Sequence, residues 1–124
     1  MTRWIGRWIM TVGIIHVAVG FVVFGEPLQA IARDGVWNAV DGHVGRPLAF
    51  WFVFLGLFTI VFGSLVDWVE GRGIQLPRHL GWAFLVLVAL GIVTMPVGGG
   101  WLLLPPALGA FVRSRRPTVG EATV

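Results

Sequence analysis

Four polar residues in an otherwise apolar sequence have the chemistry of a catalytic site: His16, Glu26, Arg46 and Thr59. An imidazole can transfer a proton near neutral pH, while a carboxylate, a guanidinium and a hydroxyl can orient a substrate. His16 and Thr59 are expected at similar depths in two apolar segments, where burial of a histidine is costly and favours a function. If the protein is an enzyme, we predict His16 as acid or base, with Glu26, Arg46 and Thr59 as orienting residues.

His16 also has a structural interpretation. A neutral imidazole in an apolar helix can tie two helices together through a hydroxyl or a carbonyl group, and Thr59 is the expected hydroxyl partner. A non-catalytic ligand site would use His16, Thr59 and Trp101. Haem ligation by His16 is an alternative, but His43 and His79 are expected near the membrane surfaces, away from His16. The sequence predicts no cofactor and no metal site.

Two acids near the end of the second apolar segment, Asp67 and Glu70, are three residues apart and share a helix face. Such a pair could hold a divalent cation. Arg7, Arg72 and Arg78 are expected close by, however, and they favour a cluster of ion pairs over a metal site.

The opposite membrane surface carries a second polar group. Its members are candidates for the mouth of a pocket, namely Glu26, His43, Arg46, Thr94 and Trp101. Glu26 is expected about 30 Å from Asp67, which excludes an acid–base pair between them. The simpler interpretation is that Glu26 pairs with Arg46 and that Trp101 anchors at the interface.

The elements that position these residues are expected to be membrane helices. The 124 residues are 56% hydrophobic and 12% charged, whereas about a quarter of the residues in a soluble domain are charged. All nine cationic residues are arginines that flank apolar runs, which argues against a nucleic-acid partner. Cysteine is absent, which excludes disulfides, thiolate metal sites and cysteine nucleophiles.

Four apolar segments are expected to cross the bilayer, which takes about 20 residues per helix. The predicted spans are Trp4–Phe24, Leu48–Trp68, Leu80–Met95 and Trp101–Val112. The last is short, and Pro105-Pro106 is expected to break it. The fold class is therefore all-α, with four transmembrane helices in a single domain over residues 1–116 and a disordered cytoplasmic tail over residues 117–124.

Between the first two spans, residues 26–47 are polar with apolar residues at helical spacing. This pattern predicts a short helix in the membrane interface that ends near Asp41-Gly42. The first two spans are expected to pack through small-residue faces, with Gly56, Thr59 and Gly63 of the second opposite His16 of the first.

The arginine distribution predicts the orientation. Seven arginines fall on one side of the predicted membrane and two, Arg33 and Arg46, on the other. The positive-inside rule then places both termini in the cytoplasm. We expect a multi-pass protein of the bacterial inner membrane, with membrane lipids as partners and a homo-oligomer as an open alternative.

Several short motifs carry a family resemblance: Gly13-x-x-His16, Phe24-Gly25-Glu26-Pro27-Leu28, Arg46-x-x-Ala49-Phe50-Trp51-Phe52, Asp67-Trp68, Leu76-Pro77-Arg78-x-Leu80-Gly81-Trp82 and Met95-Pro96-x-x-Gly99-x-Trp101. In this order they resemble a family of small bacterial four-helix membrane proteins of unknown function, through Pro106. The outline is also loosely similar to the DoxX-like group of small membrane proteins, sometimes tied to redox or thiosulfate metabolism. The absence of cysteine excludes thiol chemistry by this chain.

Three hypotheses about function follow. The first is a non-catalytic membrane bundle that acts as a subunit or binds a small hydrophobic ligand. The second is a membrane-embedded enzyme that acts on a lipid or isoprenoid-like substrate with His16 as acid or base. The third is an oligomeric transporter or channel.

Overall fold

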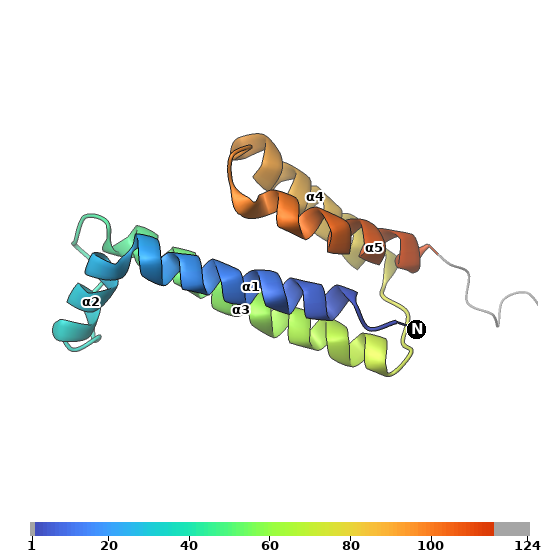
Figure 1. The fold of residues 1–124 in the computed structure, drawn as a ribbon, viewed down its shortest axis with the longest axis horizontal. Coiled ribbons are helices and arrows are strands. Elements are labelled where there is room, and N and C mark those ends of the chain that lie inside the picture. The colour runs from blue at the N-terminus through green and yellow to red at the C-terminus, as the bar shows by residue number, and fades with distance from the viewer. Residues whose placement is uncertain (1, 116–124) are drawn as a thin grey trace, which may run out of the picture.

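The structure, a computed structural model, describes residues 2–115, which form five α-helices, one 3-10 helix and no strand. The elements are α1 (Ile5–Val23), α2 (Gly25–Arg33), α3 (Arg46–Gly71), α4 (Arg78–Thr94), η1 (Gly99–Leu103) and α5 (Leu104–Ser114). Figure 1 shows two helical hairpins, α1 with α3 and α4 with α5, and α2 at the far end of the longer one. The all-α prediction is confirmed, and the predicted tail over residues 117–124 lies outside the described residues.

The α1–α3 hairpin is closely packed because glycines allow the two backbones to touch. A Cβ atom on Gly6 would lie 2.2 Å from the backbone nitrogen of Asp67. A Cβ atom on Gly13 would lie 2.7 Å from Cγ1 of Ile60. The predicted small-residue interface is confirmed, and Ile60 is the side chain that faces Gly13. Gly56 and Gly63, the glycines of the predicted α3 interface, both lie against α1.

The α4–α5 hairpin has its own small-residue contact. A Cβ atom on Gly81 would lie 2.6 Å from Oγ of Ser114. The last apolar segment is divided, as predicted, into η1 and α5. Pro105 and Pro106 do not break α5, however, because they occupy its first turn, where a helix needs no backbone N–H donor.

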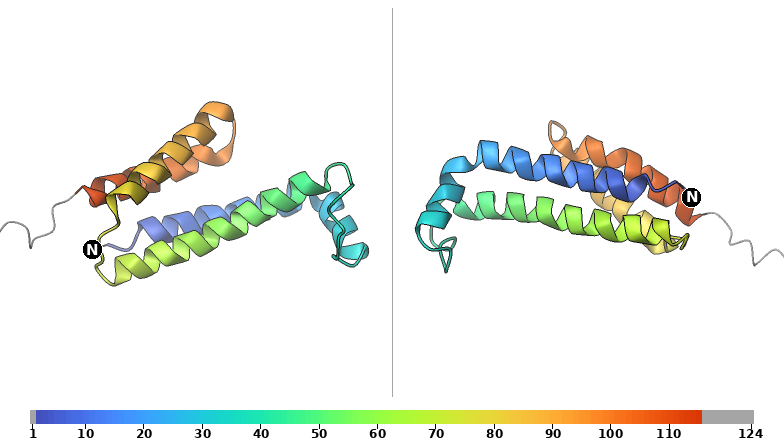
Figure 2. Two further views of the ribbon diagram at one scale, coloured as in Figure 1. Left: turned by 180° about the vertical axis from the view of Figure 1, so that it is seen from behind. Right: turned by 60° about the horizontal axis from the view of Figure 1, so that its bottom comes forward.

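The shorter hairpin covers only part of the longer one. Trp8 of α1 donates from Nε1 to the carbonyl of Leu102 in η1 at 2.7 Å, and the ring of Trp4 lies against Gly109 of α5. Trp4 directly precedes α1, and Trp8 lies in its first turn. The half of the α1–α3 hairpin next to α2 is left uncovered by α4 and α5, as the two views in Figure 2 show.

The helices at the four predicted spans differ in length. Within the described residues, α1 with 19 residues and α3 with 26 residues are long and apolar enough to cross a membrane. The apolar helix α4 has 17 residues and α5 has 11, against about 20 for a complete span. Two helices could therefore span a membrane, and four transmembrane helices are not established.

The segment after α1 differs from the prediction in one boundary. A short helix is present, but α2 ends at Arg33 rather than near Asp41. The cause is backbone conformation, because Gly35, Val36 and Asn38 have φ angles of 84°, 70° and 50°, which an α-helix cannot contain. Residues 34–45 therefore form turns that lead into α3.

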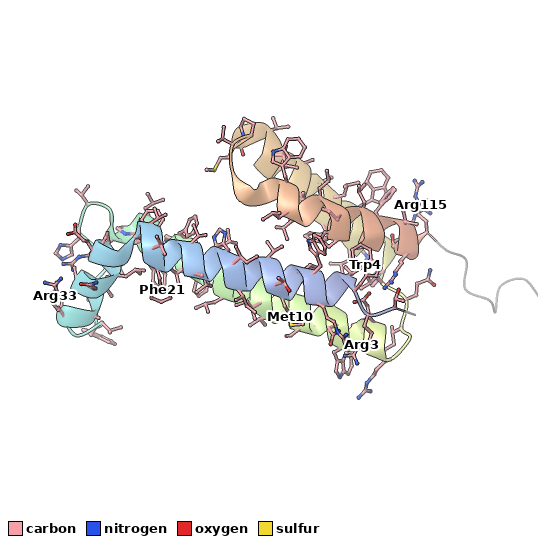
Figure 3. The ribbon with its side chains drawn as sticks, viewed as in Figure 1. Arg3, Trp4, Met10, Phe21, Arg33 and Arg115 are labelled. Atoms are coloured by element: carbon pink, nitrogen blue, oxygen red, sulfur yellow. The ribbon has the colours of Figure 1, made fainter. Side chains whose placement is uncertain are left out.

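The two ends of the molecule differ in charge. Figure 3 places Arg3 and Arg115 at the end where α1 begins and α5 finishes, and Arg33 at the opposite end. Arg72 and Arg78 flank the α3–α4 connection at the first of these ends. We call it the arginine-rich end.

Candidate functional site

Glu70 is the most buried ionisable group in the part of the chain that the structure describes, with 4% of its surface exposed. Its carboxylate accepts hydrogen bonds from the backbone N–H groups of Ile5, at 3.4 Å, and Gly6, at 2.8 Å. It also forms an ion pair with Arg113, whose guanidinium donates to the carbonyl of Thr2 as well. Glu70 therefore caps the first turn of α1 and joins it to α3 and α5 at the positive end of the helix dipole.

Asp67, one turn earlier in α3, is paired with two exposed arginines. Arg3 binds it through both Nε and Nη2, and Nε of Arg7 lies 3.3 Å from Oδ1. The predicted ion-pair cluster is confirmed with Arg7, and Arg3 is an additional partner. Arg72 instead lies over the ring of Trp68 in the same helix, with Cζ 4.3 Å from the ring centroid.

This ion-pair cluster has no room for a cation or substrate at its carboxylates. Each carboxylate already faces an arginine, and Glu70 accepts two further backbone hydrogen bonds. Residues 2–115 contain no group of three or more histidines, cysteines or acids that could hold a metal ion. The cluster is therefore a structural joint between the two hairpins.

His16 bridges α1 and α3 through a backbone carbonyl. Its Nε2 lies 3.1 Å from the carbonyl oxygen of Phe52, and because a carbonyl only accepts, Nε2 is the donor. The imidazole also stacks on the ring of Phe52, with centroids 4.0 Å apart and planes 14° apart. His16 therefore bridges the two helices as predicted, with a backbone carbonyl rather than a hydroxyl as its partner.

The partner expected for His16 is engaged elsewhere. Thr59 donates from Oγ1 to the carbonyl of Leu55, four residues earlier in the same helix, at 2.8 Å. Threonine hydroxyls in helices commonly make this bond. No sequence signal indicated that the ring and the carbonyl of Phe52 would both contact His16.

Within residues 2–115, no hydrogen bond or ion pair joins the remaining candidates to His16 or to one another. Glu26 is exposed in the first turn of α2. The predicted pair of Glu26 with Arg46 is wrong, because Arg46 binds Asp34 at 2.8 Å and the carbonyl of Ala39 at 2.7 Å. The turns of residues 34–45 fold back toward α3, which brings both partners to the guanidinium.

Trp101 lies at the tip of the α4–α5 hairpin, where its Nε1 donates to the carbonyl of Pro96 at 2.9 Å. In Figures 1 and 2 this tip is the end of the α4–α5 hairpin nearer to α2, but it is splayed away from the α1–α3 hairpin and makes no contact with α2. The structure therefore does not bring Trp101 or Thr94 to Glu26 and Arg46, and the expected pocket mouth is not assembled.

Residues 1–117 of the sequence match a family of unknown function, DUF6463. The chain belongs to this family. No curated protein and no solved structure matches the chain significantly. The resemblance to a family of unknown function is confirmed, while the bacterial source and the DoxX-like outline stay predictions.

The DUF6463 chain has one feature that its sequence did not indicate, an apolar groove between α3, the 72–77 connection and α4. Its volume is about 300 Å³, at the lower end of the range for ligand pockets. Its walls include Phe62, Leu65, Val69, Leu76, Pro77 and Leu80. Residues 72–77 hold α4 away from the end of α3. The pattern of apolar residues within either helix could not predict this separation.

The structural role of His16 in this DUF6463 chain gives a direct prediction. His16→Gln keeps a donor for the Phe52 carbonyl but loses the stacked ring, so we expect a loss of about 1 kcal/mol of stability. Thermal unfolding in detergent measures it. Unchanged stability together with loss of a copurifying ligand would contradict the structural role.

Proposed function

We propose that the chain is a non-catalytic integral membrane protein, a helical module that acts as a subunit or binds a small hydrophobic ligand. The observation that carries this proposal is the contrast between its polar and apolar groups. The buried Glu70 and the partly buried His16 use their polar side chains in bonds that join helices. Large apolar side chains, by contrast, are exposed along both long helices.

The exposure of α1 and α3 supports contact with lipid. Within the most apolar 18-residue stretch of each helix, 33% of the stretch in α1 and 22% of the stretch in α3 is buried inside the molecule. Core helices of soluble proteins are buried far more completely, because water makes exposed apolar surface costly. A bilayer removes that cost, since lipid tails are as apolar as the side chains that face them.

The membrane topology we propose keeps four crossings over residues 1–116. At 1.5 Å per residue α4 is about 25 Å long, a few ångströms short of a core of about 30 Å. Local thinning of the bilayer accommodates such a mismatch at modest cost. Arg3, Arg72, Arg78, Arg113 and Arg115 lie at the arginine-rich end. This bias supports a cytoplasmic location for that end in a bacterial inner membrane.

The enzyme hypothesis receives less support from the same geometry. An acid or base needs a second group that orients the substrate within hydrogen-bond reach. His16 is engaged by Phe52, and Thr59 by its own helix. Arg46 is held by the turn residues near α2. We therefore propose no catalytic role for these residues.

The experiment that tests the proposal uses the absence of native cysteine. His43→Cys and His79→Cys each introduce a single thiol at an exposed position, one in the turns after α2 and one in the first turn of α4. A membrane-impermeant maleimide is expected to label Cys at position 43 in intact cells and at position 79 only after permeabilisation. Equal labelling at both positions before permeabilisation, or release of the chain by carbonate, would contradict the proposal.

A further inference from the structure

The groove between α3 and α4 lies at the arginine-rich end, where the chain has more cations than acids. Arg72 follows the last turn of α3, and Arg78 begins α4 directly after Pro77 in the groove wall. Arg72 sits over Trp68, which also lines the groove. The Arg72 guanidinium therefore lies beside the groove, and Arg78 is the residue that follows its wall in sequence.

These two arginines differ from the others at this end. Within residues 2–115, Asp67 is paired with Arg3 and Arg7, and Glu70 with Arg113. The ion pairs of the described chain include neither Arg72 nor Arg78, and both residues are exposed. The rim thus has positive charge that no described acid neutralises.

We infer that this groove binds one anionic phospholipid, with an acyl chain against Phe62, Leu65 and Leu80 and the phosphate on Arg72 and Arg78. The inference rests on the proposed membrane insertion, and it names the ligand class of that module. Apolar walls match the acyl chain, whose burial is favourable. Charge complementarity at the rim selects an anionic headgroup over a zwitterionic one, since each arginine near an anionic lipid contributes attraction.

The test is native mass spectrometry of the full chain in detergent with equimolar phosphatidylglycerol and phosphatidylcholine that have identical acyl chains. The wild type is expected to retain phosphatidylglycerol preferentially. Arg72→Gln and Arg78→Gln are each expected to lower the ratio of the two bound lipids about fivefold, which corresponds to ~1 kcal/mol per arginine. Arg33→Gln removes the same charge at the opposite end, so it is the matched control and is expected to leave the ratio unchanged.

A second pair of variants tests the acyl-chain site. Ile74 lines the groove and is 49% exposed, so Ile74→Trp can fill the cavity at little cost to folding. It is expected to reduce retention of both lipids. Ile14→Trp is the control, because Ile14 is 58% exposed on α1 and is not part of the groove. Thermal unfolding of each variant verifies that the fold is retained.

Three results would overturn the inference. They are equal retention of the two lipids by the wild type, an equal effect of Arg33→Gln and Arg72→Gln, and a lipid-free dimer, in which a second copy covers the groove. Failure of the proposed function is distinguishable from these results. A chain released from membranes by carbonate contradicts membrane insertion itself, whereas a membrane-bound chain without lipid preference contradicts only the lipid site.

Discussion

Glu70→Ala is expected to lower the free energy of unfolding by about 3–5 kcal/mol, the usual effect of removing one partner from a buried ion pair. The substitution leaves the Arg113 guanidinium without its acid, and it leaves the N–H groups of Ile5 and Gly6 without an acceptor. The two N–H groups are then buried donors with no partner, and Arg113 keeps only its bonds to Thr2, which is costly. Thermal or denaturant unfolding in detergent measures the change.

Asp67→Ala is the matched control for Glu70→Ala, because it removes a carboxylate one turn earlier in the same helix. The side chain of Asp67 is 17% exposed, and its partners Arg3 and Arg7 are 43% and 65% exposed. Solvent replaces much of that interaction, so we expect a loss of about 1 kcal/mol or less. Equal losses for the two variants would contradict the role of Glu70 as the joint between the hairpins.

Gly6→Ala is expected to destabilise the protein by about 3 kcal/mol, at the upper end of the usual range for overpacking. The added Cβ would lie 2.2 Å from the backbone nitrogen and 2.5 Å from Cα of Asp67. Backbone atoms of α3 cannot move aside as a side-chain end can, so the two helices must separate. Unfolding in detergent measures the loss.

Gly91→Ala is the control for this prediction, since Gly91 lies in α4 with nothing within 4 Å of its added Cβ. Alanine has the higher helix propensity, so the variant is expected to be neutral or stabilising by up to about 1 kcal/mol. Opposite signs for the two variants would attribute the loss at Gly6 to the close helix contact. A similar loss at both positions would show that the contact is not its cause.

Hydrophobic periodicity and length predict the positions of the helices well in this chain. The predicted spans Trp4–Phe24 and Leu48–Trp68 correspond to α1 and α3 within three residues at each end. The inward position of Glu70 was also predictable, because it shares a face with the glycines of α3. These features depend on the spacing of residues within one segment.

Contacts between segments were predictable only in part. Thr59 and Ile60 are neighbours, and which of them meets Gly13 depends on how α3 turns against α1. An arginine side chain is long enough to reach several acids. Arg46 pairs with Asp34 because of the turns between them, and the φ angles of those turns could not be predicted from residue spacing in the sequence. The groove between α3 and α4 likewise follows from the path of residues 72–77 rather than from either helix.

The bonds of Glu70 have a consequence for the order in which the protein assembles. The first turn of α1 emerges first during synthesis, but the acceptor for its N–H groups is 64 residues away from Gly6 in sequence. The N–H groups of this first turn therefore lack the Glu70 carboxylate as an acceptor until α3 has been synthesised. The acid in turn lacks its arginine until α5 arrives with Arg113, 43 residues later. Helix α5, the last of the described helices, thus completes the polar joint that α1 needs, and a chain that ends before Arg113 would leave the Glu70 carboxylate without its arginine.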